Sequence, residues 1–163
     1  MSVKSSRLAL LGVGAVLFTA GIAGCGGGDD DSSDAISQEE FVTQANEFCT
    51  TFTTDSDASS ADYDEAESAG DLDAAADAYA AVGEQMGELV SNIEGLGAPE
   101  GDEDTVDEMV SAGEELSDNA AEAAEALRNE DIDGVAATNE DAGEIRTRFD
   151  QAAGDLGLTE CEA

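Results

Sequence analysis

Apolar residues recur every three to four positions along most of the chain after its first 35 residues, which is the period of an amphipathic α-helix. A first helix is predicted to begin at Ser37, because Ser37 and Glu40 form a capping box. Ile36 and Phe41 are placed around this box as a hydrophobic staple. We expect the helix to end near Thr54, with its apolar positions at Phe41, Ala45, Phe48, Cys49 and Phe52.

The next stretch, residues 55–70 (DSDASSADYDEAESAG), is polar and weakly patterned, and we predict a loop there. From Asp71 the helical period returns as a heptad seam on a second helix that ends near Gly95. The seam consists of Leu72, Ala75, Tyr79, Val82, Met86, Leu89, Ile93 and Leu96. Gly97 and the only proline, Pro99, then predict a clear break.

Two further helices are predicted after this break. The third carries Val106, Met109, Val110, Gly113, Leu116, Ala120, Ala123 and Leu127. The fourth carries Val135, Ala142, Ile145, Phe149, Ala152 and Leu156, with Gly154 and Gly157 marking its end. Four amphipathic helices with fairly short connections bury their apolar stripes most simply as an all-α, antiparallel up-and-down four-helix bundle.

The N-terminus has a different pattern. Lys4 and Arg7 precede an uncharged stretch, residues 8–24, and no acid occurs before Asp29. A basic start, a short apolar run and small residues at a cleavage site are typical of a secretory signal peptide. The strongly apolar part, residues 8–18, is shorter than the roughly 20 residues that a membrane-spanning helix needs. We therefore expect an export signal.

At the end of this signal, Ile22, Ala23, Gly24 and Cys25 resemble the lipobox of bacterial lipoproteins. The resemblance implies that the Cys25 thiol is joined to diacylglycerol, that the chain is cut just before Cys25, and that the new amino group can take an N-acyl lipid. Two or more acyl chains give stable membrane anchoring. The alternative is an ordinary signal peptide that is cut near a spare cysteine.

The domain organisation follows from these signals. Residues 1–24 are predicted as the signal peptide, residues 25–35 as the lipidated cysteine with a flexible Gly/Asp/Ser tether, and residues 36–163 as an acidic four-helix domain. The expected location is the cell membrane, where the lipid anchor holds the domain at the extracytoplasmic face.

The charge of the chain limits its partners. Its formal net charge is −35, and without the leader only Arg128, Arg146 and Arg148 remain against 40 acidic residues. This charge argues against nucleic acids and anionic lipid headgroups as partners, because both require Lys and Arg to displace counterions, and we predict no nucleic-acid binding. We expect a monomer whose partners are the membrane, through the anchor, and cationic proteins or cations. The acidity is also consistent with a salty habitat, where the Debye length is about 3 Å at 1 M salt.

Two cysteines remain once Cys25 is lipidated. An even pair in an exported protein predicts a disulfide, here between Cys49 and Cys161. Cys49 lies about three turns inside the first helix, so the tail after the fourth helix must turn back along the bundle to reach it. A redox-active or metal-binding pair is the alternative, but it lacks any histidine or neighbouring cysteine.

The mature chain resembles the small secreted or lipid-anchored helical domains of high-GC Gram-positive bacteria. The resemblance lies in a capped first helix that leads to Cys49 and in the ending GLTEC at residues 157–161. The resemblance implies a lipidated helical bundle with one disulfide and implies no activity.

The sequence contains no histidine, which excludes a Ser-His-Asp triad, di-iron pairs built on histidine, and histidine-based zinc sites. It also contains no glycine-rich phosphate loop with a lysine. We therefore predict a non-enzymatic interaction or structural role, with no cofactor beyond the lipid. One alternative is an accessory solute-binding role, which requires a cavity between the helices. Another is weak binding of divalent cations.

One pattern supports the cation alternative. The loop positions 1, 3, 5, 6 and 12 of an EF-hand calcium site are matched by Asn129, Asp131, Asp133, Gly134 and Glu140. However, residues 131–133 (DID) closely resemble residues 71–73 (DLD), and both triplets lie where a helix is predicted to begin. An N-cap aspartate explains both triplets, so the helix start is favoured over a calcium loop.

Overall fold

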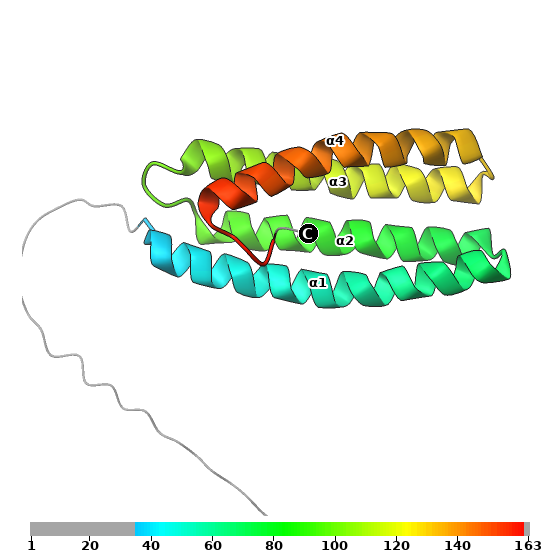
Figure 1. Ribbon diagram of the computed structural model, residues 1–163, viewed down its shortest axis with the longest axis horizontal. Coiled ribbons are helices and arrows are strands. Elements are labelled where there is room, and N and C mark those ends of the chain that lie inside the picture. Colours follow the sequence, from blue (N-terminus) through cyan, green and yellow to red (C-terminus); the bar gives the residue numbers. More distant parts are fainter. Residues whose placement is uncertain (1–34, 162–163) are drawn as a thin grey trace, which may run out of the picture. The chain divides into compact units, whose positions relative to one another are not determined.

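The computed structural model describes residues 35–161, and four helices account for most of them: α1 (Gln38–Ala69), α2 (Leu72–Leu96), α3 (Glu103–Arg128) and α4 (Ile132–Leu156). The helices lie side by side and the chain direction alternates from each to the next (Figure 1). The predicted all-α four-helix bundle is therefore confirmed. The predicted signal peptide, Cys25 and all but the last residue of the tether lie outside the described residues.

The first helix is much longer than predicted, and the loop predicted at residues 55–70 is wrong. The buried stripe of α1 continues beyond Phe52, but with small or polar residues at helical spacing, namely Ser56, Ser59, Tyr63 and Ala66. Ser59 is only 8% exposed, although its hydroxyl gives no apolar signal in the sequence. The helix ends only at Gly70, whose positive φ of 71° a glycine adopts without strain.

Side-chain caps set the start of three helices. The Ser37 hydroxyl accepts a hydrogen bond from the Glu40 backbone N–H at 3.3 Å. The carboxylates of Asp71 and Asp131 each accept the backbone N–H three residues further on, at 3.1 and 3.0 Å. These bonds satisfy N–H groups that have no partner within the helix. The helix starts predicted at these three residues are confirmed.

Packing between the helices follows the order of the chain. α1 packs along α2, α2 along α3, and α3 along α4, whereas α1 and α4 are not packed closely against each other. α2 and α3 pack tightly at Gly113, where an added Cβ would lie 2.1 Å from Val90 Cγ1. The bundle is thus tight along three of its helix interfaces and loose along the fourth.

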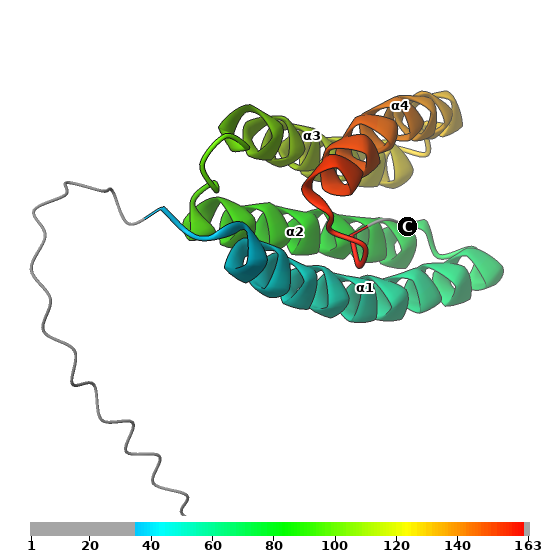
Figure 2. The same cartoon turned by 60° about the vertical axis from the view of Figure 1, so that its left-hand side comes forward.

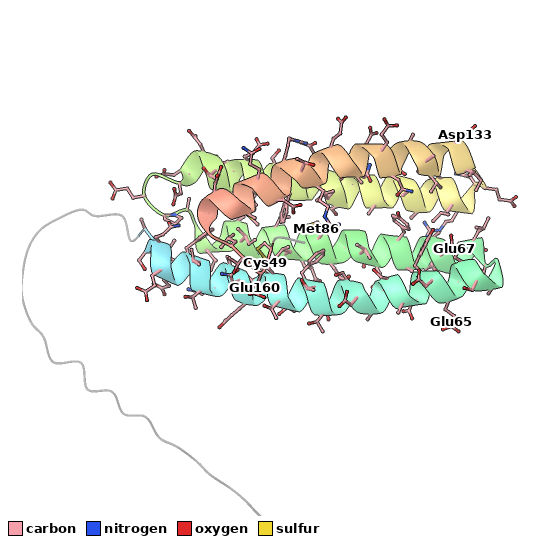
Figure 3. The ribbon with its side chains drawn as sticks, in the orientation of Figure 1. Cys49, Glu65, Glu67, Met86, Asp133 and Glu160 are labelled. Carbon is pink, nitrogen blue, oxygen red and sulfur yellow. A yellow bond between two sulfur atoms is a disulfide. The ribbon has the colours of Figure 1, made fainter. Side chains whose placement is uncertain are left out.

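The buried residues form two clusters. The large-residue cluster includes Phe41, Met86, Leu89, Ile93, Met109, Phe149, Leu156 and Leu158. The alanine cluster consists of Ala66, Ala75, Ala76, Ala124 and Leu127, flanked by Tyr63, Leu72, Tyr79 and Val135. Figure 3 places Cys49, of the first cluster, well away from Glu65, Glu67 and Asp133 at the opposite end of the bundle. In the part of the chain that the structure describes, no helix is both long enough and apolar enough to cross a membrane.

Candidate ligand-binding cavity

The disulfide predicted between Cys49 and Cys161 is present in the structure, with the two Cα atoms 5.0 Å apart. It connects α1 to the chain that follows α4, and Figure 2 shows this chain running from the end of α4 towards α1. The two cysteines are separated by 112 positions in the sequence. The bond therefore ties the last segment of the described chain to the first helix.

Local interactions turn the tail back before the disulfide fixes it. Gly157 ends α4 with a φ of 79°, and the next N–H, that of Leu158, donates to the Ala153 carbonyl at 2.9 Å. Leu158 is fully buried in the large-residue cluster. The Glu160 backbone N–H then donates to Asn46 Oδ1 on α1, also at 2.9 Å. The tail is thus held by a buried side chain, a hydrogen bond and a covalent bond.

A cavity of about 430 Å³ lies beside this disulfide and is lined by residues of all four helices and the tail. The large apolar side chains of its lining are Phe52, Val82, Met86, Leu89, Leu116 and Phe149. The volume falls within the range of about 300–1,000 Å³ that is usual for small-molecule sites. The cavity follows from the loose side of the bundle, because α1 and α4 both contribute lining residues but do not pack closely together.

A few polar groups join the apolar lining. The Tyr79 hydroxyl on α2 donates to Asn139 Oδ1 on α4 at 2.7 Å, and both residues line the cavity together with Asn119 of α3. Burial raises the pKa of Tyr79, and the neighbouring Tyr63 adds to this shift. The phenol is therefore a neutral hydrogen-bonding group at physiological pH.

Three charged side chains also line the cavity, namely Arg146, Asp150 and Glu160. Arg146 Nε lies 4.0 Å from Asp150 Oδ2, one turn further along α4. No basic side chain within residues 35–161 forms an ion pair with Glu160. The lining therefore contains one carboxylate more than it has cations.

The residues of the calcium pattern lie at the junction of α3 and α4. Asn129 caps the end of α3, Asp131 caps the start of α4, and Asp133 and Glu140 are exposed on α4 itself. Because α4 begins at Ile132, the oxygen atoms do not lie in the twelve-residue loop that an EF-hand requires. Within the described chain, no three His, Cys, Asp or Glu side chains gather in a way that could hold a metal ion. Calcium binding stays a prediction.

Reasoning from the sequence identified most of the apolar lining only as core, and it missed the roles of Asn119, Asn139 and Arg146. Asn119 is partly buried, whereas Asn139 and Arg146 are exposed, so the sequence pattern does not distinguish these residues from other surface polar residues. They line one cavity because α1 and α4 do not pack closely together. Comparison of the chain with protein-family models, with curated proteins and with solved structures found no match. Its function is therefore inferred from its own residues.

Proposed function

We propose that this chain is a lipid-anchored protein of the cell envelope whose helical domain binds a small, largely apolar molecule in the cavity between its helices. The location rests on the signal and on the lipobox resemblance of residues 22–25. The binding role rests on the cavity.

The cavity's size and lining are the observation that carries the binding role. An apolar space with a few convergent polar groups, here Tyr79, Asn119 and Asn139, is the usual composition of a small-molecule site.

A neutral fluorescent probe tests this binding role. N-phenyl-1-naphthylamine fluoresces strongly in apolar surroundings, and we expect the purified protein to produce a saturable rise in its fluorescence at one probe per chain. The Gly143→Leu variant should weaken this binding at least about tenfold, because Gly143 lines the cavity. A Cβ at Gly143 meets no atom within 4 Å, so the new side chain occupies open space without straining the helix.

Gly95→Leu is the matched control. Gly95 is also a helical glycine with no atom within 4 Å of an added Cβ, but it does not line the cavity. The control should bind the probe as the unchanged protein does. A probe signal that does not saturate, or equal weakening in both variants, contradicts the proposed binding site.

The anchored location is tested separately by the intact mass of the protein isolated from its own membranes. We expect a chain that begins at Cys25 and carries the mass of a diacylglycerol, with or without a further acyl chain. An unmodified Cys25, or a chain that retains residues 1–24, contradicts the lipoprotein proposal and leaves the cavity proposal standing.

A further inference from the structure

The charged groups around the cavity indicate which head group its ligand carries. Arg146 is offset by Asp150 one turn away, so the unbalanced charge of the lining is the Glu160 carboxylate. From these groups we propose that the ligand is an amphiphile with a cationic head group, which Glu160 contacts while the apolar chain lies against Met86 and Leu89. This inference rests on the proposed binding function and specifies its ligand.

Glu160 is well placed for this role because its backbone is held from two sides. Its N–H donates to Asn46 Oδ1 at 2.9 Å, and the next residue, Cys161, is bonded to Cys49. The carboxylate is therefore attached to a fixed segment at the edge of the cavity, while its side chain remains exposed to solvent. Figure 3 shows Glu160, Cys49 and Met86 in the same region of the bundle.

The aromatic lining independently favours a cation. Phe52, Tyr79 and Phe149 all line the cavity. Aromatic faces attract ammonium groups, and sites for quaternary ammonium ligands are commonly built from such rings. The Glu160 carboxylate and the aromatic rings thus both favour a positively charged head group.

The net negative charge of the whole chain also favours a cationic ligand. With a formal net charge of −35, the chain repels anionic amphiphiles such as fatty acids and concentrates cations near its surface. This general field does not distinguish Glu160 from any other acid. The test must therefore separate a local contact from the overall charge.

The experiment compares three amphiphiles that share a ten-carbon chain: decyltrimethylammonium, decyl maltoside and decanoate. Each displaces N-phenyl-1-naphthylamine from the full mature protein, below its micelle concentration and at about 0.1 M salt, where the Debye length is about 10 Å. We expect decyltrimethylammonium to displace the probe at a concentration at least tenfold lower than decanoate, with the neutral maltoside between them.

Glu160→Gln is expected to reduce this cation preference at least threefold while leaving the affinity for the neutral probe unchanged. Glu65→Gln is the matched control, because it removes the same charge from an exposed residue at the other end of the bundle that does not line the cavity (Figure 3). The control should keep the full preference.

The outcomes separate the two proposals. If the probe binds but the three head groups compete equally, the inference about the cationic head group is overturned and the binding function stands. If Glu160→Gln and Glu65→Gln reduce the preference equally, the overall charge sets it and the role of Glu160 is overturned. If the neutral probe itself does not bind, the proposed function fails.

Discussion

The two halves of the bundle bury different kinds of side chain. The half that contains the large-residue cluster buries Phe41, Ile93 and Met109 almost completely and carries the disulfide and most of the cavity. The other half buries mainly alanine, and among the residues of the alanine cluster Leu127 is the one large buried side chain. There, the Tyr63 and Tyr79 rings meet edge to face, with their centroids 5.2 Å apart.

The difference shows two ways of holding helices together. Buried large side chains stabilise through the apolar area that they remove from water, at about 25 cal/mol per Å². Alanine contributes little area but allows backbones to approach closely, and its high helix propensity keeps each helix continuous. We therefore expect the large-residue half to supply most of the stability and the alanine half to open first.

Removal of the disulfide should change the free energy of unfolding more than any of the other substitutions below. Replacing both cysteines, Cys49→Ala with Cys161→Ala, is expected to lower the free energy of unfolding by about 3–5 kcal/mol, because the bond closes a long loop in the unfolded chain. Guanidinium denaturation of the oxidised protein and the double variant measures this. A loss below about 1 kcal/mol would show that the bond does little for the large-residue half.

A matched pair of core truncations compares the halves directly. Ile93→Ala, in the large-residue cluster, is expected to cost about 3–4 kcal/mol, and Leu127→Ala, in the alanine cluster, about 2 kcal/mol. We expect a smaller cost for Leu127 because the other buried residues of its cluster are all alanine and its large neighbours are only partly buried. Denaturation curves of the two variants give both values, and a larger loss for Leu127→Ala contradicts the proposed division of stability.

Close packing of α2 against α3 is tested by adding a single methyl group. Gly113→Ala is expected to lower the free energy of unfolding by about 1–3 kcal/mol, because the new Cβ collides with Val90 Cγ1. Gly95→Ala, where the space is open, should instead raise it by up to about 1 kcal/mol. Thermal unfolding of the two variants checks the signs, and stabilisation by Gly113→Ala counts against this tight contact.

The smallest effect concerns Tyr79. Tyr79→Phe removes the hydrogen bond to Asn139 and is expected to cost less than about 1 kcal/mol at neutral pH, because Asn139 is exposed. Burial raises the pKa of Tyr79 above its ordinary value of 10.0, so folding favours the neutral phenol. The resulting stability is fully present below about pH 10 and is lost as the pH rises through the pKa of the folded state.

Alkaline titration therefore distinguishes the variant from the unchanged protein. Unfolding free energies measured from about pH 9 to 12 should fall less steeply for Tyr79→Phe than for the unchanged chain. Parallel pH dependences would mean that Tyr79 ionises equally easily in the folded and unfolded states.

Several features of the fold depend on residues close together in the sequence, and these were predictable. Ser37, Asp71 and Asp131 cap helices because a side-chain oxygen reaches the N–H three residues on, whatever the rest of the fold does. The heptad seam of α2 and the apolar stripes of α3 and α4 depend on spacing alone. The cysteine pairing was predicted from the even pair that remains beside Cys25, and it required the tail to turn back.

The tertiary structure alone decided two other features. Residues 55–69 continue α1 because alanines of α2 accept a stripe of serine, tyrosine and alanine against them, and that complementarity is invisible in either segment by itself. The cavity exists because α1 and α4 do not pack closely against each other. The distance between them depends on the packing of all four helices around the core. Local sequence sets where a helix begins and which face is apolar, whereas the distance between two helices far apart in the chain is set by everything that packs between them.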